Sequence, residues 1–410
     1  MTASATLEGG PEARVERTFP ALDGARALAA TAVLLHHVAF WTQDYTPDLV
    51  GRIFSRLDVG VAIFFVLSGF LLARPLFLAA VEERPAPRTA AYLWRRGLRI
   101  LPAYWLTVVV ALLVLPHNEG VAGAGTWLRH LTLTQIYGSG GLREGLSHTW
   151  SLCTEAAFYV LLPFAGAWVA RLLRGRVTRP GRALAALGLA TLLGWGWLVW
   201  IHAADAFPGA GLDLWLPAYA GWFAGGMALA VLSVCARDAR PVRAVTELGA
   251  SLPTCWAAAG ALFWVATTAV AGPQGLVRPT APEALLKNAL YLGVAVLLVL
   301  PLVFGDQRQG WVRAALSSRA GRFLGDISYA LFLVHLTVLV GGLTVLDLGP
   351  FRGNLFWVSV AVWVVSVAVA AVVYAVVERP LRRFRRLVPE RPAAATTGAA
   401  TAQTAPSARV

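Results

Sequence analysis

Ten long apolar runs constrain this chain of 410 residues more than any other feature of its sequence. Each run is close to the roughly 20 residues that an α-helix needs to cross a bilayer core of about 30 Å. The runs lie at about 25–42, 58–80, 98–116, 149–170, 184–202, 212–235, 250–271, 286–304, 324–347 and 354–377. Backbone polar groups inside a bilayer must pair within their own segment, so the runs predict α-helices. We therefore expect an all-α fold, a polytopic membrane helix bundle of about ten transmembrane helices.

The basic residues follow an alternating pattern along the chain. A net charge of +13 is compatible with a nucleic-acid-binding protein, but 28 of the 35 Lys and Arg residues fall in every second segment between the runs. This asymmetry is the positive-inside rule of membrane proteins. It predicts that both termini are cytoplasmic and that the protein is a multi-pass protein of the bacterial cytoplasmic (inner) membrane. Membrane lipid, and no nucleic acid, is the expected partner.

Composition also divides the chain into three parts. Residues 1–19 are polar and form a cytoplasmic N-terminal segment that we expect to be disordered. Residues 20–386 form the membrane domain, and we interpret its first apolar run as a retained helix and not as a cleaved signal peptide. Residues 387–410 are rich in Ala, Thr and Pro and are expected to be a disordered cytoplasmic tail.

Ionisable side chains at membrane depth are costly, so those within the runs are candidates for function. In the first run, Arg26 and His37 are eleven residues apart, which is about three helical turns and 16 Å, so both lie on one helix face. His36 is turned away from that face. An imidazole above a cationic anchor suits a base that removes a proton from an acceptor. The alternative is a histidine that is hydrogen-bonded between helices.

Small residues in the second run and arginines before the third run allow further predictions. Ser68 lies with Gly60 and Gly69 in a run whose small residues predict close helix packing. Arg96 and Arg99 are three residues apart, so two guanidiniums can meet on one helix face and bind a phosphorylated cytosolic ligand. The alternative for the arginines is purely topological, because a cytoplasmic loop needs positive charge.

The fourth run carries Glu155 about one and a half turns into an apolar helix, and His148 lies seven residues before it, nearly on the same face. The carboxylate could orient a catalytic histidine, bind an acceptor hydroxyl, or balance the charge of a buried arginine. The sequence leaves these alternatives open. In the ninth run, His335 lies near the middle of the membrane. The arginines that follow Glu378 are interpreted as a stop-transfer anchor that is attracted to anionic lipid.

Six segments, in this order, resemble the acyltransferase-3 family, the bacterial membrane O-acyltransferases that modify sugars, surface polysaccharides and macrolides. They are Arg26 with His37, Gly60 to Phe70, Arg95 to Trp105, Thr149 to Tyr159, Ile327 to His335, and Glu378 to Pro380. The resemblance covers about residues 20–386. The chain departs from the family where Ala62 replaces a frequent polar residue, and where Ala156 and Ala157 precede Phe158.

The resemblance implies roles for individual residues. His37 is expected to be the essential catalytic histidine and Arg26 its partner, with Arg96 and Arg99 handling the acyl donor. Glu155 matches the glutamate of the family's fourth span and is expected to be catalytic. Further substrate-binding residues are expected in the matching segments, namely Ser68, Trp150, Tyr159 and His335.

Together these features predict a membrane O-acyltransferase that moves a short acyl group from an acyl-CoA co-substrate to a hydroxyl of a glycan, a lipid-linked sugar or a macrolide-type acceptor. His37 would act as general base or as transient acyl carrier. The acceptor and the membrane face remain open. No bound cofactor and no metal site are expected, since most of the seven histidines are widely spaced.

A protein of another class fits the same topology. In a proton-coupled transporter or flippase, His37, Glu155 and His335 would form a proton relay and the arginines a substrate funnel. The sequence offers no pair of broken helices in corresponding halves, which tells against that alternative. A non-catalytic scaffold is a third possibility, and it predicts that His37 can be replaced without effect.

Overall fold

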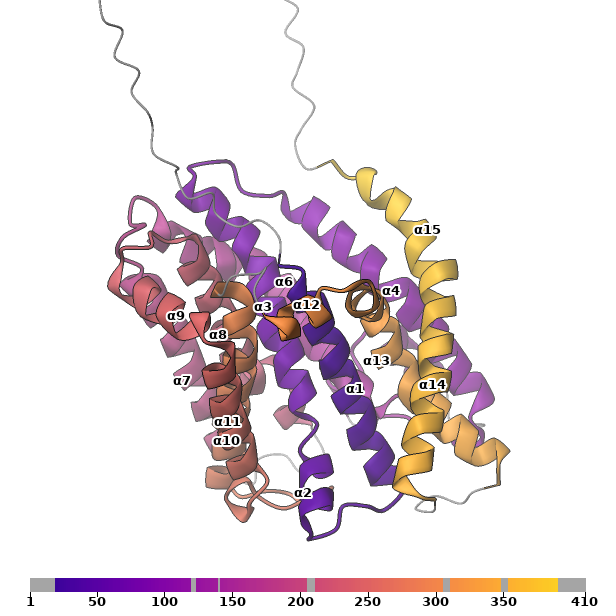
Figure 1. Ribbon diagram of the computed structural model, residues 1–410. Coiled ribbons are helices and arrows are strands. Elements are labelled where there is room, and N and C mark those ends of the chain that lie inside the picture. Colours follow the sequence, from indigo (N-terminus) through magenta and orange to yellow (C-terminus); the bar gives the residue numbers. More distant parts are fainter. Residues whose placement is uncertain are drawn as a thin grey trace, which may run out of the picture.

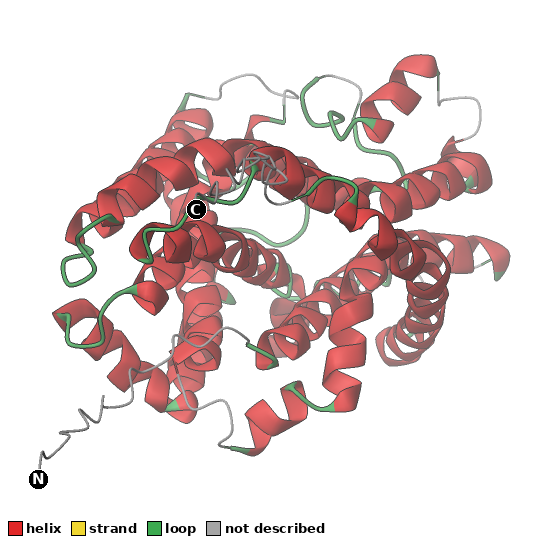
Figure 2. Cartoon of the chain, turned by 90° about the horizontal axis from the view of Figure 1, so that it is seen from above, coloured by secondary structure: helices red, strands yellow, loops and turns green. Residues whose placement is uncertain are grey.

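The structure, a computed structural model, describes residues 19–118, 123–138, 141–204, 211–304, 310–347 and 353–389. All regular elements within these ranges are helices, and no strand occurs there (Figure 2). The predicted all-α fold is confirmed. The two segments expected to be disordered, 1–19 and 387–410, lie almost entirely outside the described residues.

Ten long helices correspond one to one to the ten apolar runs. They are α1 (Ala21–Trp41), α3 (Val59–Val81), α4 (Thr89–Val114), α6 (Trp150–Leu173), α7 (Gly181–Ala203), α8 (Leu216–Val234), α10 (Leu252–Ala266), α11 (Ala281–Phe304), α13 (Arg319–Val345) and α14 (Leu355–Val373). Five shorter α-helices are α2 (Leu49–Ser55), α5 (Ala124–Leu131), α9 (Arg240–Ala250), α12 (Trp311–Leu316) and α15 (Arg379–Leu381). Figure 1 shows the long helices running side by side as one bundle.

Eight helical segments of the described chain are long and apolar enough to cross a membrane, and nine if α9 and α10, which are bent by 89°, form one span. The helix α1 is not among them, because Arg26, His36 and His37 lower its hydropathy. Its 21 residues are nevertheless about 31 Å long, enough to cross a bilayer core. The protein is thus a multi-pass helical bundle, while the count of ten spans stays a prediction.

Burial distinguishes the centre of the bundle from its rim. The most apolar stretches of the α3 and α13 spans are 72% buried inside the protein, whereas those of α7 and the span that contains α14 are only 22% buried. The outer helices therefore present their apolar side chains to lipid. The helix α1 packs against both α3 and α13, so the three form the centre of the fold.

Glycines allow the central helices to touch along their backbones. A Cβ atom at Gly226 of α8 would collide with the carbonyl oxygen of Val66 on α3, and one at Gly69 with that of Phe223 on α8. A Cβ atom at Gly60 would lie 2.5 Å from the carbonyl oxygen of Ala29 on α1. The packing role predicted for Gly60 and Gly69 is confirmed, because only glycine permits these approaches.

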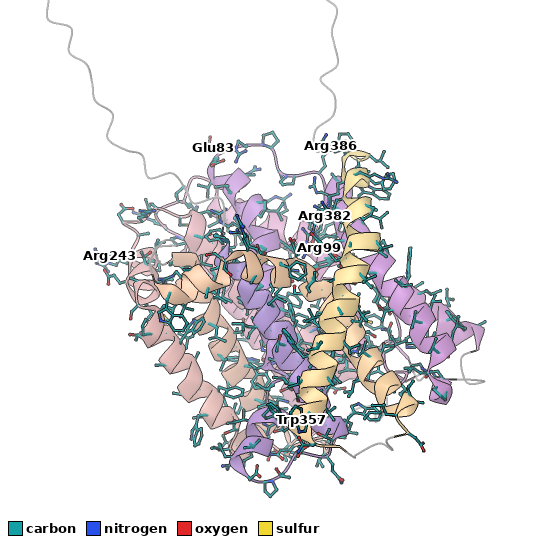
Figure 3. The ribbon with its side chains drawn as sticks, turned by 45° about the vertical axis from the view of Figure 1, so that its right-hand side comes forward. Glu83, Arg99, Arg243, Trp357, Arg382 and Arg386 are labelled. Carbon is teal, nitrogen blue, oxygen red and sulfur yellow. The ribbon has the colours of Figure 1, made fainter. Side chains whose placement is uncertain are left out.

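The two ends of the bundle carry different segments. Figure 3 shows Glu83, in the connection between α3 and α4, at the same end as Arg386, while Trp357 at the start of α14 lies at the other end. This is the arrangement that the alternating charge pattern predicts. Several boundaries differ from the predicted runs by a few residues, and α4 begins at Thr89, nine residues before its run, so Arg96 lies on the same helix as Arg99.

Candidate functional site

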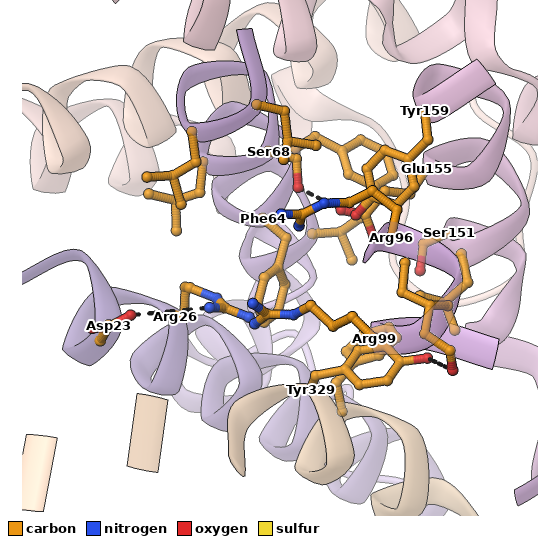
Figure 4. Close-up of a pocket in the computed structure, with 18 residues that line it drawn as sticks. Asp23, Arg26, Phe64, Ser68, Arg96, Arg99, Ser151, Glu155, Tyr159 and Tyr329 are labelled. Carbon is orange, nitrogen blue, oxygen red and sulfur yellow. Dashed lines mark hydrogen bonds and ion pairs between the residues drawn. The ribbon is translucent and has the colours of Figure 1, made fainter. Parts of the chain in front are cut away.

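A cavity of about 320 Å³ opens between α1, α3, α4, α6 and α13 (Figure 4). Most of its wall is apolar, with Phe64, Phe65 and Phe332 among the larger side chains. Its polar lining residues are Asp23, Arg26, Ser68, Arg96, Arg99, Ser151, Glu155, Tyr159 and Tyr329. Six of the predicted site residues, from four helices, therefore meet in one cavity: Arg26, Ser68, Arg96, Arg99, Glu155 and Tyr159.

Three arginines give the cavity its charge. Figure 4 shows Arg26 of α1 and Arg99 of α4 extending toward each other, with Arg96 one turn away on α4. Asp23 lies 4.0 Å from Arg26, but Arg96 and Arg99 form no hydrogen bond or ion pair with any described residue. Like charges held between apolar walls produce a strong positive potential, which favours an anionic ligand such as a phosphate.

The carboxylate of Glu155 lines the arginine cavity and lies with the arginines, not in the histidine cluster. It accepts a hydrogen bond from Ser68 and contributes a favourable electrostatic interaction to Arg26. Within the described residues it forms no hydrogen bond to an imidazole. Of the alternatives that the sequence leaves open, the geometry favours a counter-charge to the arginines or a group that binds a ligand hydroxyl.

A second group of polar residues consists of three histidines from distant parts of the chain. His37 lies on α1, His148 on the 3-10 helix Ser147–Thr149, and His335 on α13. The ring centroid of His335 lies 5.1 Å from that of His37 and 4.7 Å from that of His148. The ring centroids of His37 and His148 are 6.0 Å apart. No group of His, Cys, Asp or Glu in the described chain has the geometry of a metal site.

Hydrogen bonds assign the protons of this cluster. His335 Nδ1 lies 2.7 Å from the carbonyl oxygen of Phe332, so this nitrogen carries a proton and Nε2 a lone pair. His37 Nδ1 lies 2.8 Å from the carbonyl oxygen of Val33 and 3.2 Å from Nε2 of His335. Both neighbours are acceptors, so Nδ1 of His37 is protonated and its Nε2 is left as a free base.

The role of His148 was missed by the sequence prediction, which placed it on the face of Glu155. Its Nε2 donates to the carbonyl oxygen of Leu333 at 3.1 Å, and its buried Nδ1 has no hydrogen-bond partner. A sharp break explains the difference: the chain around His148 is a 3-10 turn that precedes α6, so helical spacing does not extend from Glu155 back to it.

Two aromatic rings separate the cavity from the histidines. His37 does not line the cavity, whereas Phe332 does. The Phe332 ring lies 5.2 Å from His148 and 5.7 Å from Phe64, which also lines the cavity. Arg26 and His37 are eleven residues apart on α1 and so occupy two levels of the bundle, and Phe332 lies both at the cavity and beside the histidines. Trp150, predicted to bind substrate, lies outside the cavity and packs on Tyr219.

Beyond the histidines, a third polar cluster lies where α2 meets α3. Lys287 donates to Asp58 at 2.7 Å, and Tyr291 donates to the same carboxylate. The Tyr45 hydroxyl lies 2.9 Å from Nδ1 of His36, and burial raises the pKa of Tyr45, so its phenol keeps its proton. Sequence analysis missed Asp58 and Lys287, although opposite charges at the ends of two apolar runs are a usable signal.

Comparison with known proteins provides an independent assignment. The model of a family described as an acyltransferase domain, Acyl_transf_3, matches residues 19–375. The chain is 30% identical over 158 residues to the peptidoglycan O-acetyltransferase OatA of Listeria monocytogenes, covering 35% of this chain and 23% of that protein. It is 26% identical over 201 residues to the O-acetyltransferase OatA of Staphylococcus aureus, covering 45% of this chain and 30% of that protein.

A third relative is the putative peptidoglycan O-acetyltransferase YrhL of Bacillus subtilis, 30% identical over 161 residues, which are 36% of this chain and 23% of that protein. The matched stretches thus span less than a third of the length of each of these relatives. No solved structure matches the chain.

Proposed function

This chain belongs to the acyltransferase-3 family, and we propose that it transfers a short acyl group from an acyl-CoA to a hydroxyl of a glycan. The observation that carries the proposal is the pairing of an arginine-lined cavity with a histidine whose Nε2 is a free base. The first feature suits a phosphorylated donor, and the second suits deprotonation of a hydroxyl.

The acyl end of the donor enters the arginine cavity, while its phosphate groups stay at the mouth. Arg26, Arg96 and Arg99 attract the negatively charged coenzyme, and guanidiniums bind phosphate oxygens in bidentate fashion. The apolar wall, which includes Leu72 and Ile100, accommodates the acyl group and the adjoining chain. Glu155 and Ser68 offer a hydrogen-bonding pair within reach of the amide groups of that chain.

His37 acts on the acceptor. Its Nε2 takes the proton of the acceptor hydroxyl while the oxygen attacks the thioester carbonyl, and the carbon–sulfur bond then breaks. The departing thiolate receives the proton from the imidazolium. Through this cycle Nδ1–H of His37 stays bonded to the carbonyl oxygen of Val33 and to Nε2 of His335, which fixes the ring. A base in this position is worth about 10²–10⁴ in rate.

A transient acyl-imidazole on His37 is the second form of the mechanism. It applies if donor and acceptor reach His37 from different ends of the bundle, because the acyl group must then be held between the two steps. Either form requires the acyl group to pass Phe64 and Phe332, which stand between the cavity and the histidines.

The acceptor is proposed to be a glycan hydroxyl of the bacterial cell surface. The relatives are named as peptidoglycan O-acetyltransferases, which supports a carbohydrate of the cell envelope before a lipid-linked sugar or a macrolide-type acceptor. It follows that the protein works in the bacterial cytoplasmic membrane, where a cytosolic acyl-CoA and an envelope glycan are both accessible.

The test is acyl-CoA turnover by detergent-purified protein. Acetyl-CoA and propionyl-CoA are offered with peptidoglycan fragments and glycosylated small molecules, and free thiol and acylated product are quantified. We expect His37→Ala to lower turnover about 10²–10⁴-fold without loss of folding. His202→Ala is the matched control, because His202 makes the same contact to its own helix, to Leu198, away from the cluster. Transport of an acceptor without thioester consumption would replace the proposal by the transporter.

A further inference from the structure

The C-terminal segment closes against the start of α4, next to the arginine cavity. Arg382 and Arg385 lie on the 3-10 helix Arg382–Arg386 and line a small pocket together with Arg99 and Glu378. Arg99 also lines the main cavity, so the two are adjacent. Trp94 of α4 donates to the carbonyl oxygen of Phe384 at 2.9 Å and fixes the segment in place. Figure 3 shows Arg99 beside Arg382, with Arg386 further out.

Positive charge accumulates in this corner. The charged groups that act most strongly on Arg385 are Arg382, Arg99, Arg96 and Arg95, all of the same sign. Asp326 balances Arg382 at 3.3 Å, and Glu378 is buried in the small pocket. The arginines of the corner outnumber these carboxylates, so an anion bound among them would stabilise the group.

The size of the main cavity limits how much of the donor it can enclose. Pockets that enclose a drug-sized ligand measure about 300–1,000 Å³. A cavity of about 320 Å³ can hold an acyl group and part of the pantetheine arm, but not a whole coenzyme A thioester with its nucleotide and three phosphates. With the thioester turned toward His37, the nucleotide end has to lie outside the cavity, at its mouth.

We propose that Arg382 and Arg385, together with Arg99, form a binding site for the phosphate groups of the donor's nucleotide. This rests on the proposed function and extends it to residues that the sequence assigned only to membrane anchoring. The same phosphate chemistry occurs in anionic lipid headgroups, which such arginines also bind. The two sources differ in one respect: only for a nucleotide site does the effect of the arginines on the reaction depend on whether the donor carries its nucleotide.

A donor that lacks the nucleotide distinguishes a nucleotide-binding site from a lipid-binding site. Arg385→Gln is assayed with acetyl-CoA and with acetyl-pantetheine, which lacks the nucleotide and all phosphates. We expect KM for acetyl-CoA to rise about tenfold, as for the loss of a charge-assisted hydrogen bond, with KM for acetyl-pantetheine and kcat unchanged. The double variant Arg382→Gln/Arg385→Gln should extend the difference. Arg243→Gln is the control, because Arg243 is an exposed arginine paired with Glu247 on α9.

An equal change of KM for both donors, or no change for either, would overturn the nucleotide site. If the change instead appears only in nanodiscs that contain anionic lipid, the arginines serve as an anchor. Equilibrium binding of coenzyme A and of pantetheine to the same variants gives an answer even where turnover fails. A wild type that consumes no thioester yet binds coenzyme A more tightly than Arg385→Gln would reject the proposed function and retain the site.

Discussion

Nε2 of His335 lies 3.2 Å from Nδ1 of His37, although 298 positions of sequence separate the two residues. The contact joins α1 to α13 at the centre of the bundle and holds the proton of His37 on the nitrogen that faces the protein. His335 is thus a positioning residue for the proposed base, in the manner of the groups that orient histidines in other hydrolytic and transfer enzymes.

Replacing His335, whose Nε2 accepts a hydrogen bond from His37, should slow the reaction without weakening binding of the acyl donor. We expect His335→Leu to lower kcat about tenfold or more, less than the roughly 10²–10⁴ expected for His37→Ala, with KM for the acyl-CoA unchanged. His335→Gln should recover part of kcat, because an amide oxygen can accept from Nδ1 of His37. Steady-state kinetics of the three variants check this. Wild-type kcat in His335→Leu would show that the contact is only structural.

The arginine cavity predicts a complementary pattern. We expect Arg96→Gln to raise KM for acetyl-CoA about tenfold, because a guanidinium without an ion-pair partner in the described structure is lost from the donor site. Arg96→Lys should recover only part of the affinity, since an ammonium cannot bind phosphate in bidentate fashion. Arg237→Gln, at an exposed position of the same predicted membrane side, is the control. Equal KM values in all variants would remove Arg96 from the donor site.

The two rings between cavity and histidines should control the acyl group. We expect Phe64→Ala to increase turnover of butyryl- and hexanoyl-CoA relative to acetyl-CoA by about tenfold, because the wall of the cavity recedes. Phe158→Ala removes the same volume from a ring that stacks on Phe223 and does not line the cavity. Competition assays with mixed thioesters measure the ratio. An unchanged chain-length preference in Phe64→Ala, or the same shift in Phe158→Ala, would contradict this role.

The ion pair of Asp58 and Lys287 is expected to stabilise the fold. Both side chains are about three-tenths exposed, so we expect Asp58→Asn to destabilise by about 1–3 kcal/mol, less than a fully buried pair. The double variant Asp58→Asn/Lys287→Met should be more stable than either single variant, because no unpaired charge remains. Thermal unfolding in detergent gives the values. Additive losses would show that the two charges do not interact.

Close contact of α3 and α8 depends on Gly226. We expect Gly226→Ala to destabilise by about 1–3 kcal/mol, because the new methyl group meets the carbonyl oxygen of Val66, a backbone atom that cannot rotate away. Gly260→Ala on α10 is the matched control, since its Cβ has open space and alanine favours a helix. The melting temperatures of both variants should therefore move in opposite directions. A stable Gly226→Ala protein would mean that the two helices separate without cost.

The helices could be located from the sequence because their signal is local. Bilayer thickness and backbone hydrogen bonding require each apolar run to form its own helix, so all ten runs overlap helices in the structure. The ends were less certain: α4 begins at Thr89, before the third run, and its Arg96 and Arg99 line the cavity. Family membership was also predicted from six motifs and is confirmed.

By itself the sequence determined the helical bundle, its alternating charge, and candidate residues of the types that the chemistry needs, among them Arg26, Arg96 and His37. Only the tertiary structure decided that His335 contacts His37, that His148 joins them, and that Phe332 divides the histidines from the arginine cavity. The physical reason is the range of the interactions. Helix formation depends on neighbours in the chain, whereas the partner of a buried polar group depends on which helix faces pack together, and those faces come from opposite ends of the sequence.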